Sequence, residues 1–162
     1  MDYDIQIETI STPRRTAVVR RQAALADLPK VVPDGCGIVW NVIRPLRDSG
    51  AIKGVGRNLA LYLDDAINLE VGIELKQPLD QPRGEVIGST LPTGTVATAL
   101  HLGPYQQLKD AHAAIRAWCA KRGHALDGRN WEIYGHWREE WNADPSRIRT
   151  DVYYLLSAAA AG

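Results

Sequence analysis

The sequence has no excess of charge and almost none of the residues that build disulfide or metal scaffolds. Its 19 Lys and Arg residues balance 19 Asp and Glu residues, so no global field attracts nucleic-acid phosphates. The two cysteines, Cys36 and Cys119, belong to no CxxC motif or Cys/His cluster. Each is therefore expected to be a small buried hydrophobic side chain in a reducing compartment. These shortages argue against a dedicated nucleic-acid binder.

Long apolar runs are also missing. No stretch approaches the ~18 residues that a membrane span needs. The N-terminal segment MDYDIQIETIS alternates and carries acids, unlike a signal peptide. We therefore expect a cytoplasmic protein that does not associate with membranes. The length of 162 residues fits one domain over residues 1–157, followed by a flexible tail over 158–162.

Motifs for metals, nucleotides and serine nucleophiles are absent. The segment Gly35-Cys36-Gly37 lacks the third glycine and the preceding strand of a dinucleotide loop. There is no Walker motif and no G-x-S-x-G elbow. No HExxH or similar spacing occurs among the four histidines, His101, His112, His124 and His136. The sequence therefore predicts no metal site and no cofactor.

Tryptophan and tyrosine replace phenylalanine entirely. The chain has five Trp, six Tyr and no Phe, within a hydrophobic fraction of 45%. Both residues carry a polar group on an aromatic ring, which favours a wet, aromatic-lined cavity. They also serve in ordinary cores, so both interpretations stay open.

The sequence contains an internal repeat. The segment GRNLALY at residues 56–62 recurs as GRNWEIY at residues 128–134. Two weaker matches occur in the same order, Pro13–Val18 with Pro92–Ala97 and Glu70-Val71 with Asp151-Val152. Three matches in one order predict two repeats, covering about residues 1–80 and 81–157.

Each repeat reads as strand–strand–helix–strand–strand. The expected strands are residues 4–8, 14–22, 58–63 and 68–76 in the first repeat, and 85–90, 95–102, 130–136 and 149–156 in the second. The expected helices are residues 33–48, where Pro33 suits the first turn, and 103–122, where Gly123 is a natural stop. The pattern predicts an α+β fold with pseudo-twofold symmetry, antiparallel sheet, one long helix per half and a central cleft.

The second half resembles a known family. The informative residues are His101-Leu102-Gly103-Pro104-Tyr105, Trp118, Gly128, Trp131-Glu132-Ile133-Tyr134, Asp144-Pro145 and Thr150–Tyr154. This order is similar to the GyrI-like family, the ligand-sensing domain of many AraC- and MerR-type multidrug regulators. The resemblance implies tandem repeats with a pocket between them and a central acid, at Glu132, that accepts lipophilic cations. The two repeats use up the chain, so no helix-turn-helix or winged helix is expected here.

Glu132 is the main candidate site residue. In its predicted strand, alternation sends Glu132 and Tyr134 to one face. The matching position of the first repeat is Ala60, so an acid at this place belongs to one half. A bound cation or a ring of hydroxyl donors would compensate a buried carboxylate. The alternative is a solvated glutamate on an exposed strand face.

The other candidates are aromatic residues and one further acid. Tyr105, at the start of the second helix, either reaches the cleft or packs on the sheet, and Tyr134 is at least as well suited to packing. Trp131 and Trp137, with Trp141, are candidates for cation–π surface. Glu74 and Tyr153 are candidate wall residues, although a shift of one residue would exchange their faces. Core packing is the expected role of Trp40 and Trp118.

Two functions fit these expectations. The first is a stand-alone binding protein for an apolar, often cationic, aromatic molecule around Glu132. The second, carried by the resemblance, is a hydrolase that opens electrophilic cyclopropane-type compounds with Glu132 as general base. Binding without turnover is preferred, and enzymatic activity stays open. The family also includes topoisomerase inhibitors, so a protein partner or a second copy of the chain is a further alternative, without a sequence motif to support it.

Overall fold

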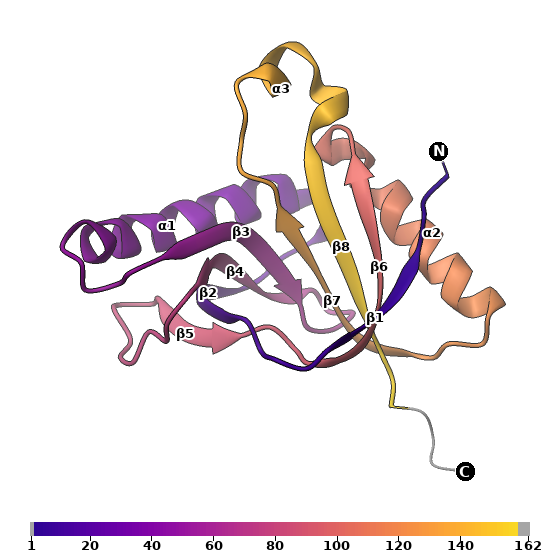
Figure 1. Cartoon of the computed structure of the whole chain (residues 1–162), viewed down its shortest axis with the longest axis horizontal. Helices are drawn as coiled ribbons and strands as arrows, with labels where there is room; N and C mark the ends of the chain where they lie inside the picture. The colour runs from indigo at the N-terminus through magenta and orange to yellow at the C-terminus, as the bar shows by residue number, and fades with distance from the viewer. Residues whose placement is uncertain (1, 159–162) are drawn as a thin grey trace. The chain divides into compact units, whose positions relative to one another are not determined.

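The computed structural model describes residues 2–158, and packing divides the chain into two units. The α1 unit comprises Thr12–Pro92, and the α2 unit comprises Met1–Ser11 with Thr93–Gly162. Each unit has four antiparallel strands and one long helix (Figure 1). The expected α+β class is confirmed. Apart from Ala158, the expected flexible tail lies outside the described residues. Among those residues, no helix is long and apolar enough to cross a membrane.

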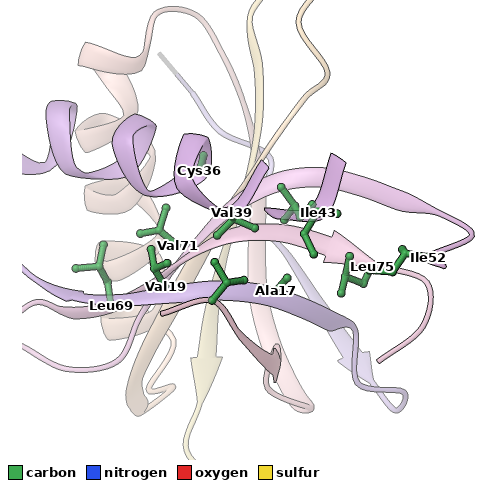
Figure 2. Close-up of a cluster of buried hydrophobic side chains, with 11 residues drawn as sticks. Ala17, Val19, Cys36, Val39, Ile43, Ile52, Leu69, Val71 and Leu75 are labelled. Atoms are coloured by element: carbon green, nitrogen blue, oxygen red, sulfur yellow. The ribbon is translucent and has the colours of Figure 1, made fainter. Parts of the chain in front are cut away.

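The α1 unit places its strands in the order β3-β4-β2-β5. Its elements are β2 (Arg15–Gln22), a 3-10 turn η1 (Leu25–Asp27), α1 (Leu28–Asp48), β3 (Val55–Tyr62), β4 (Asn68–Leu75) and β5 (Ile87–Thr90). Buried side chains of α1, among them Cys36, Val39 and Ile43, pack on Val19 and Val71 of the strands (Figure 2). One face of α1 thus closes an apolar core against β2 and β4. Trp40 packs at the edge of this core, beneath the guanidinium groups of Arg44 and Arg47.

The expected start of the first helix was wrong. The helix begins at Leu28 rather than at residue 33, and Pro29 occupies its first turn. Pro33 lies inside the helix, as does Pro45 near its end at Asp48. A proline near a helix start costs little only in the first turn, where its missing N–H has no partner to lose. Both Pro29 and Pro33 lie near the start of the helix, and the prediction placed the first turn at the later of the two.

The α2 unit places its strands in the order β1-β6-β8-β7. Its elements are β1 (Gln6–Ile10), β6 (Gly94–Leu102), a 3-10 turn η2 (Tyr105–Gln107), α2 (Leu108–Lys121), β7 (Leu126–Tyr134), α3 (Glu140–Ala143), a 3-10 turn η3 (Pro145–Arg147) and β8 (Arg149–Leu156). The buried stripe of α2 comprises Leu108, Ala111, Ile115 and Cys119, and it packs on β6 and β8. In Figure 1, α2 runs along one side of these strands.

The end of α2 follows the expected glycine stop. Gly123 has φ +73°, and the next residue, His124, donates its N–H to the Cys119 carbonyl at 2.9 Å. Gly123 itself donates to Ala120, which completes a Schellman turn. The opening of the helix differs from expectation, because residues 105–107 form a 3-10 turn and the α-helix begins at Leu108. Trp118 packs at the edge of the core, stacked on His124.

The first strand of each expected repeat pairs with a strand of the other expected repeat. β1 pairs with β6, from Gln6 opposite Thr98 to Ile10 opposite Gly94. β5 pairs with β2, from Arg15 opposite Thr90 to Val18 opposite Ile87. Each packing unit therefore draws one strand from across the expected boundary near residue 80. The two repeats of about residues 1–80 and 81–157 stay a prediction from the sequence. Their boundary does not coincide with the boundaries of the α1 and α2 units.

A glycine pair tests the packing of the α1 unit. A Cβ on Gly72 would overlap the backbone carbonyl of Ala17 in the adjacent strand, whereas a Cβ on Gly37 in α1 would meet nothing within 4 Å. We expect Gly72→Ala to lower the free energy of unfolding by about 1–3 kcal/mol through overpacking. We expect Gly37→Ala to raise it by about 0.5–1 kcal/mol, because alanine is the better helix former. Urea denaturation measures both, and equal effects of the two substitutions would contradict the described packing.

Candidate functional site

Glu132 is a buried acid on the helix-covered face of β7. Its side chain and that of Tyr134 lie on the same face of the strand, because successive residues alternate. Tyr134 contacts the core beneath α2, so this is the face that α2 covers. Glu132 is only 5% exposed, which rules out the alternative of a solvated strand glutamate. Burial of a carboxylate is costly unless hydrogen-bond donors replace water.

Two side chains supply such donors. The Tyr134 hydroxyl donates to Glu132 Oε1 at 2.7 Å. His112 of α2 places its Nε2 2.8 Å from Glu132 Oε2. Each carboxylate oxygen thus has a donor, one from the same strand and one from the helix above it. Hydrogen bonds to a charged group contribute about 1.5–3 kcal/mol each, enough to offset much of the desolvation cost.

The network continues beyond the histidine. The Tyr154 hydroxyl of β8 lies 2.7 Å from His112 Nδ1, and Arg116 donates to the same hydroxyl at 2.9 Å. His112 and Arg116 are four residues apart and so lie on one side of α2. Burial raises the pKa of the Tyr154 phenol, and the charge of Glu132 adds to this rise, while Arg116 opposes it. The phenol therefore keeps its proton at neutral pH.

Tyr105 extends the site towards the surface. Its ring meets the ring of Tyr134 edge to face, with centroids 5.7 Å apart, and the residue is 42% exposed. The turn that carries it depends on His101, whose Nδ1 lies 2.9 Å from the Tyr3 hydroxyl and whose Nε2 lies 3.2 Å from the Pro104 carbonyl. Tyr105, Tyr134 and Glu132 thus form a chain of contacts from an exposed ring to a buried carboxylate.

The remaining aromatic candidates lie elsewhere in the α2 unit. Trp131 faces away from Glu132, is buried, and stacks on Tyr153 of β8 with centroids 5.4 Å apart. Trp137 lies beyond the end of β7, is 52% exposed, and meets the buried Trp141 edge to face. The structure therefore gives these residues two separate aromatic pairs, neither of which contacts the carboxylate in the interactions described above.

Glu74 belongs to the other unit. Its carboxylate lies on β4 and pairs with Arg57 at 3.5 Å and with Arg14 at 3.9 Å. Two arginines compensate its charge, so Glu74 is a poor anchor for a further cation. Two shallow surface hollows also occur in the α1 unit, and none of the predicted site residues lines them. Within residues 2–158, no three His, Cys, Asp or Glu side chains are grouped as a metal site would require.

Sequence reasoning missed His112, Tyr154 and Arg116. The only functional role considered for the histidine was that of a metal ligand, and its spacing does not fit one. The available signal was its position at the border of the buried stripe of α2, beside Ala111 and one turn before Arg116. A polar side chain at such a border needs a partner on the strands beneath it. Glu132, already expected on a covered strand, was the natural partner to test.

Several solved structures share this fold. The C-terminal domain of EcmrR matches 98% of this chain and 100% of that domain, at 20% identity and TM-score 0.74. In an EcmrR–DNA complex, the match spans 58% of the longer EcmrR chain. A hydrolase from Listeria innocua matches over 94% of this chain and 91% of its own, at 13% identity and TM-score 0.65. SAV2435 bound to tetraphenylphosphonium matches over 98% and 95%, at 9% identity and TM-score 0.57.

The sequence itself gives the family directly. No curated protein matches the chain significantly. The model of the GyrI-like small molecule binding domain matches residues 5–156, which includes both packing units almost completely. Three of the residues that suggested this family, Glu132, Tyr134 and Tyr154, take part in the network described above. The chain belongs to the GyrI-like family of small-molecule binding domains.

Proposed function

We propose that this protein binds an apolar, often cationic, aromatic molecule beside Glu132. The observation that carries the proposal is a buried carboxylate linked by contacts to the surface through two tyrosine rings, Tyr105 and Tyr134. The carboxylate selects positive charge, and the rings supply apolar surface with a negative face. Pockets of this kind combine a mostly apolar wall with few fixed polar groups.

Two groups that can be neutral are among the partners of Glu132. Its described donors are a phenol and an imidazole, which hydrogen-bond the carboxylate without a formal charge when the imidazole is neutral. Arg116 is exposed and three hydrogen bonds away from Glu132, so solvent screens its field. A desolvated carboxylate attracts a cation more strongly than one in water, because the local dielectric is low.

Tyr134 is the side chain that a ligand would displace. Its hydroxyl donates to Oε1 of Glu132, whereas His112 contacts the other carboxylate oxygen, Oε2. A cation that approaches past Tyr105 would replace this hydrogen bond with a charge–charge contact. Rotation of one phenol would then open the site without moving the helix. His112 would hold the other oxygen, Oε2, and so keep the carboxylate oriented.

The comparisons support a ligand of this chemistry. SAV2435, which shares the fold, was solved with tetraphenylphosphonium, a lipophilic aromatic cation. EcmrR, which also shares the fold, was solved on DNA. We infer that this chain corresponds to the ligand-sensing part of such proteins. Its balanced charge favours a role in which the domain binds a small molecule and does not itself contact nucleic acid.

A hydrolase is the second candidate function. The observation in its favour is the carboxylate beside an imidazole, together with the fold shared with a hydrolase from Listeria innocua. Glu132 would take a proton from water, and the water oxygen would bond to the electrophilic ring carbon. The strained carbon–carbon bond would break, and the other carbon of that bond would keep its electron pair and take up a proton. Both imidazole nitrogens already have partners, so the base would be Glu132 at Oε1. Simple binding requires fewer rearrangements and is preferred.

The charge of Glu132 can be removed without changing its shape. We expect Glu132→Gln to weaken tetraphenylphosphonium binding at pH 8.5 by about tenfold or more, since one desolvated ion contact contributes about 1.4 kcal/mol or more. Binding of neutral triphenylphosphine oxide should change much less. Isothermal titration calorimetry measures both ligands on each variant.

The matched control for this test is Glu8→Gln, an exposed acid on β1. It removes one negative charge from the same unit, so it reports the effect of net charge alone. Far-UV circular dichroism and thermal melting establish that each variant is folded. Equal loss for the cation and the neutral compound, or equal loss in Glu8→Gln, would contradict an anionic site at Glu132.

The ring of Tyr105 offers a second test. We expect Tyr105→Ala to weaken phosphonium binding roughly fivefold, because a cation–π contact of a partly exposed ring contributes about 1 kcal/mol. Tyr105→Phe should retain nearly full affinity, since the ring remains. Calorimetry at pH 8.5 distinguishes the two. Loss of affinity in the Phe variant as large as in the Ala variant would assign the effect to the hydroxyl instead.

Turnover separates the two candidate functions. The assay incubates the protein with an electrophilic cyclopropane and follows the ring-opened, hydrated product by mass spectrometry. A binding protein forms no product above the buffer rate. A hydrolase forms product, and Glu132→Gln abolishes this while the variant still binds the compound. Product formation that survives in Glu132→Gln would exclude Glu132 as the base.

A further inference from the structure

The four-residue network around His112 has a defined direction. The two end groups set the direction of the hydrogen bonds, because a guanidinium can only donate them and a carboxylate can only accept them. Arg116 donates to the Tyr154 oxygen, the Tyr154 hydroxyl donates to His112 Nδ1, and His112 Nε2–H donates to Glu132. Every contact is satisfied when His112 is neutral and carries its proton on Nε2.

A second proton on His112 changes this network. Nδ1 would then carry a hydrogen and face the Tyr154 hydroxyl, so the phenol would have to turn its own hydrogen elsewhere. At the other nitrogen the change is favourable, because the hydrogen bond to Glu132, at 2.8 Å, becomes an ion pair. The pair has no net charge, and a ligand cation beside it would meet an imidazolium as well as a carboxylate.

We propose that His112 is a charge gate for the Glu132 site, which accepts cations while the imidazole is neutral and rejects them once it is protonated. The inference rests on the proposed function, since it specifies how that same site chooses its ligand. A proton on His112 and a ligand cation compete for one carboxylate. By linkage, each weakens the binding of the other by the same factor.

Histidine is the side-chain type whose charge ordinarily changes between pH 5 and 8. The titratable groups in contact with His112 are Glu132 of β7 and Tyr154 of β8, and Arg116 of α2 and Tyr134 of β7 bind these two in turn. Another histidine of the same unit, His101, is fully buried, and its two nitrogens contact the Tyr3 hydroxyl and the Pro104 carbonyl.

The first experiment measures the affinity for tetraphenylphosphonium from pH 8.5 to 5.5 by calorimetry. For the wild type we expect a fall that approaches about tenfold per pH unit below the titration of His112, because one proton competes with one cation. Neutral triphenylphosphine oxide should bind equally well throughout. His112→Gln keeps a donor for Glu132 but does not titrate, so its phosphonium affinity should vary less than threefold.

The outcomes distinguish this inference from the proposed function. Phosphonium binding by the wild type that ignores pH would overturn the gate and leave the binding site intact. An equal pH dependence in His112→Gln would also overturn it, and would assign the titration to Glu132 or His101. Absence of phosphonium binding at pH 8.5 would overturn the proposed function and the gate together.

A second measurement avoids any variant that could fail to fold. Nitrogen-15 NMR of the histidine rings reports the tautomer and the titration of His112 in the wild type. We expect the Nε2–H tautomer at pH 8, and we expect saturating tetraphenylphosphonium to lower the titration midpoint of His112, since the bound cation disfavours the imidazolium. A midpoint that stays in place, or the opposite tautomer, would contradict the gate.

Discussion

The constraint on which the α2 unit depends is the burial of one carboxylate. Glu132 lies beneath α2 with almost no access to solvent, so its hydration must be replaced by donors at fixed positions. His112 supplies one of them and therefore ties the rotation of α2 to the register of β7. A helix turned by one residue would bring Ala111 or Ala113 to the same place and leave that oxygen without this donor. Polar and apolar contacts thus specify the same docking of the helix.

This coupling would make the proposed site both rigid and responsive. The apolar stripe of α2, with Ile115 and Cys119 fully buried, fixes the helix by packing that does not depend on pH. The polar row beside it, from Arg116 to Glu132, contains groups that rearrange by rotation of a phenol or gain of a proton. A packed core can support such changes because it does not take part in them. Ligand binding at the proposed site would then need no movement of the backbone.

Much of the fold could be predicted from sequence because its signals are local. All eight strands were expected from alternation and turn residues, and Gly123 marked the end of α2 through its backbone freedom. Strand pairing was not local, and the chain gave no sign that β1 would pair with β6. The site divided in the same way: the common face of Glu132 and Tyr134 followed from alternation, whereas the contact with His112 joins residues of two elements. Only packing of α2 on the strands brings these residues together.

The two units use similar elements for different purposes, and one position shows why. On β3 the residue that matches Glu132 is Ala60, which is fully buried and needs no donor. The buried stripe of α1 has Cys36 beside Gly35 where α2 has His112 beside Ala111, and the Cys36 thiol donates to the backbone carbonyl of Gly72. Burial raises the pKa of this thiol to about 12, so it stays neutral. A carboxylate on β3 would face no imidazole there, and a histidine at residue 36 would face no carboxylate. The acid and its histidine are therefore interdependent, and a charged site in one unit requires both substitutions together.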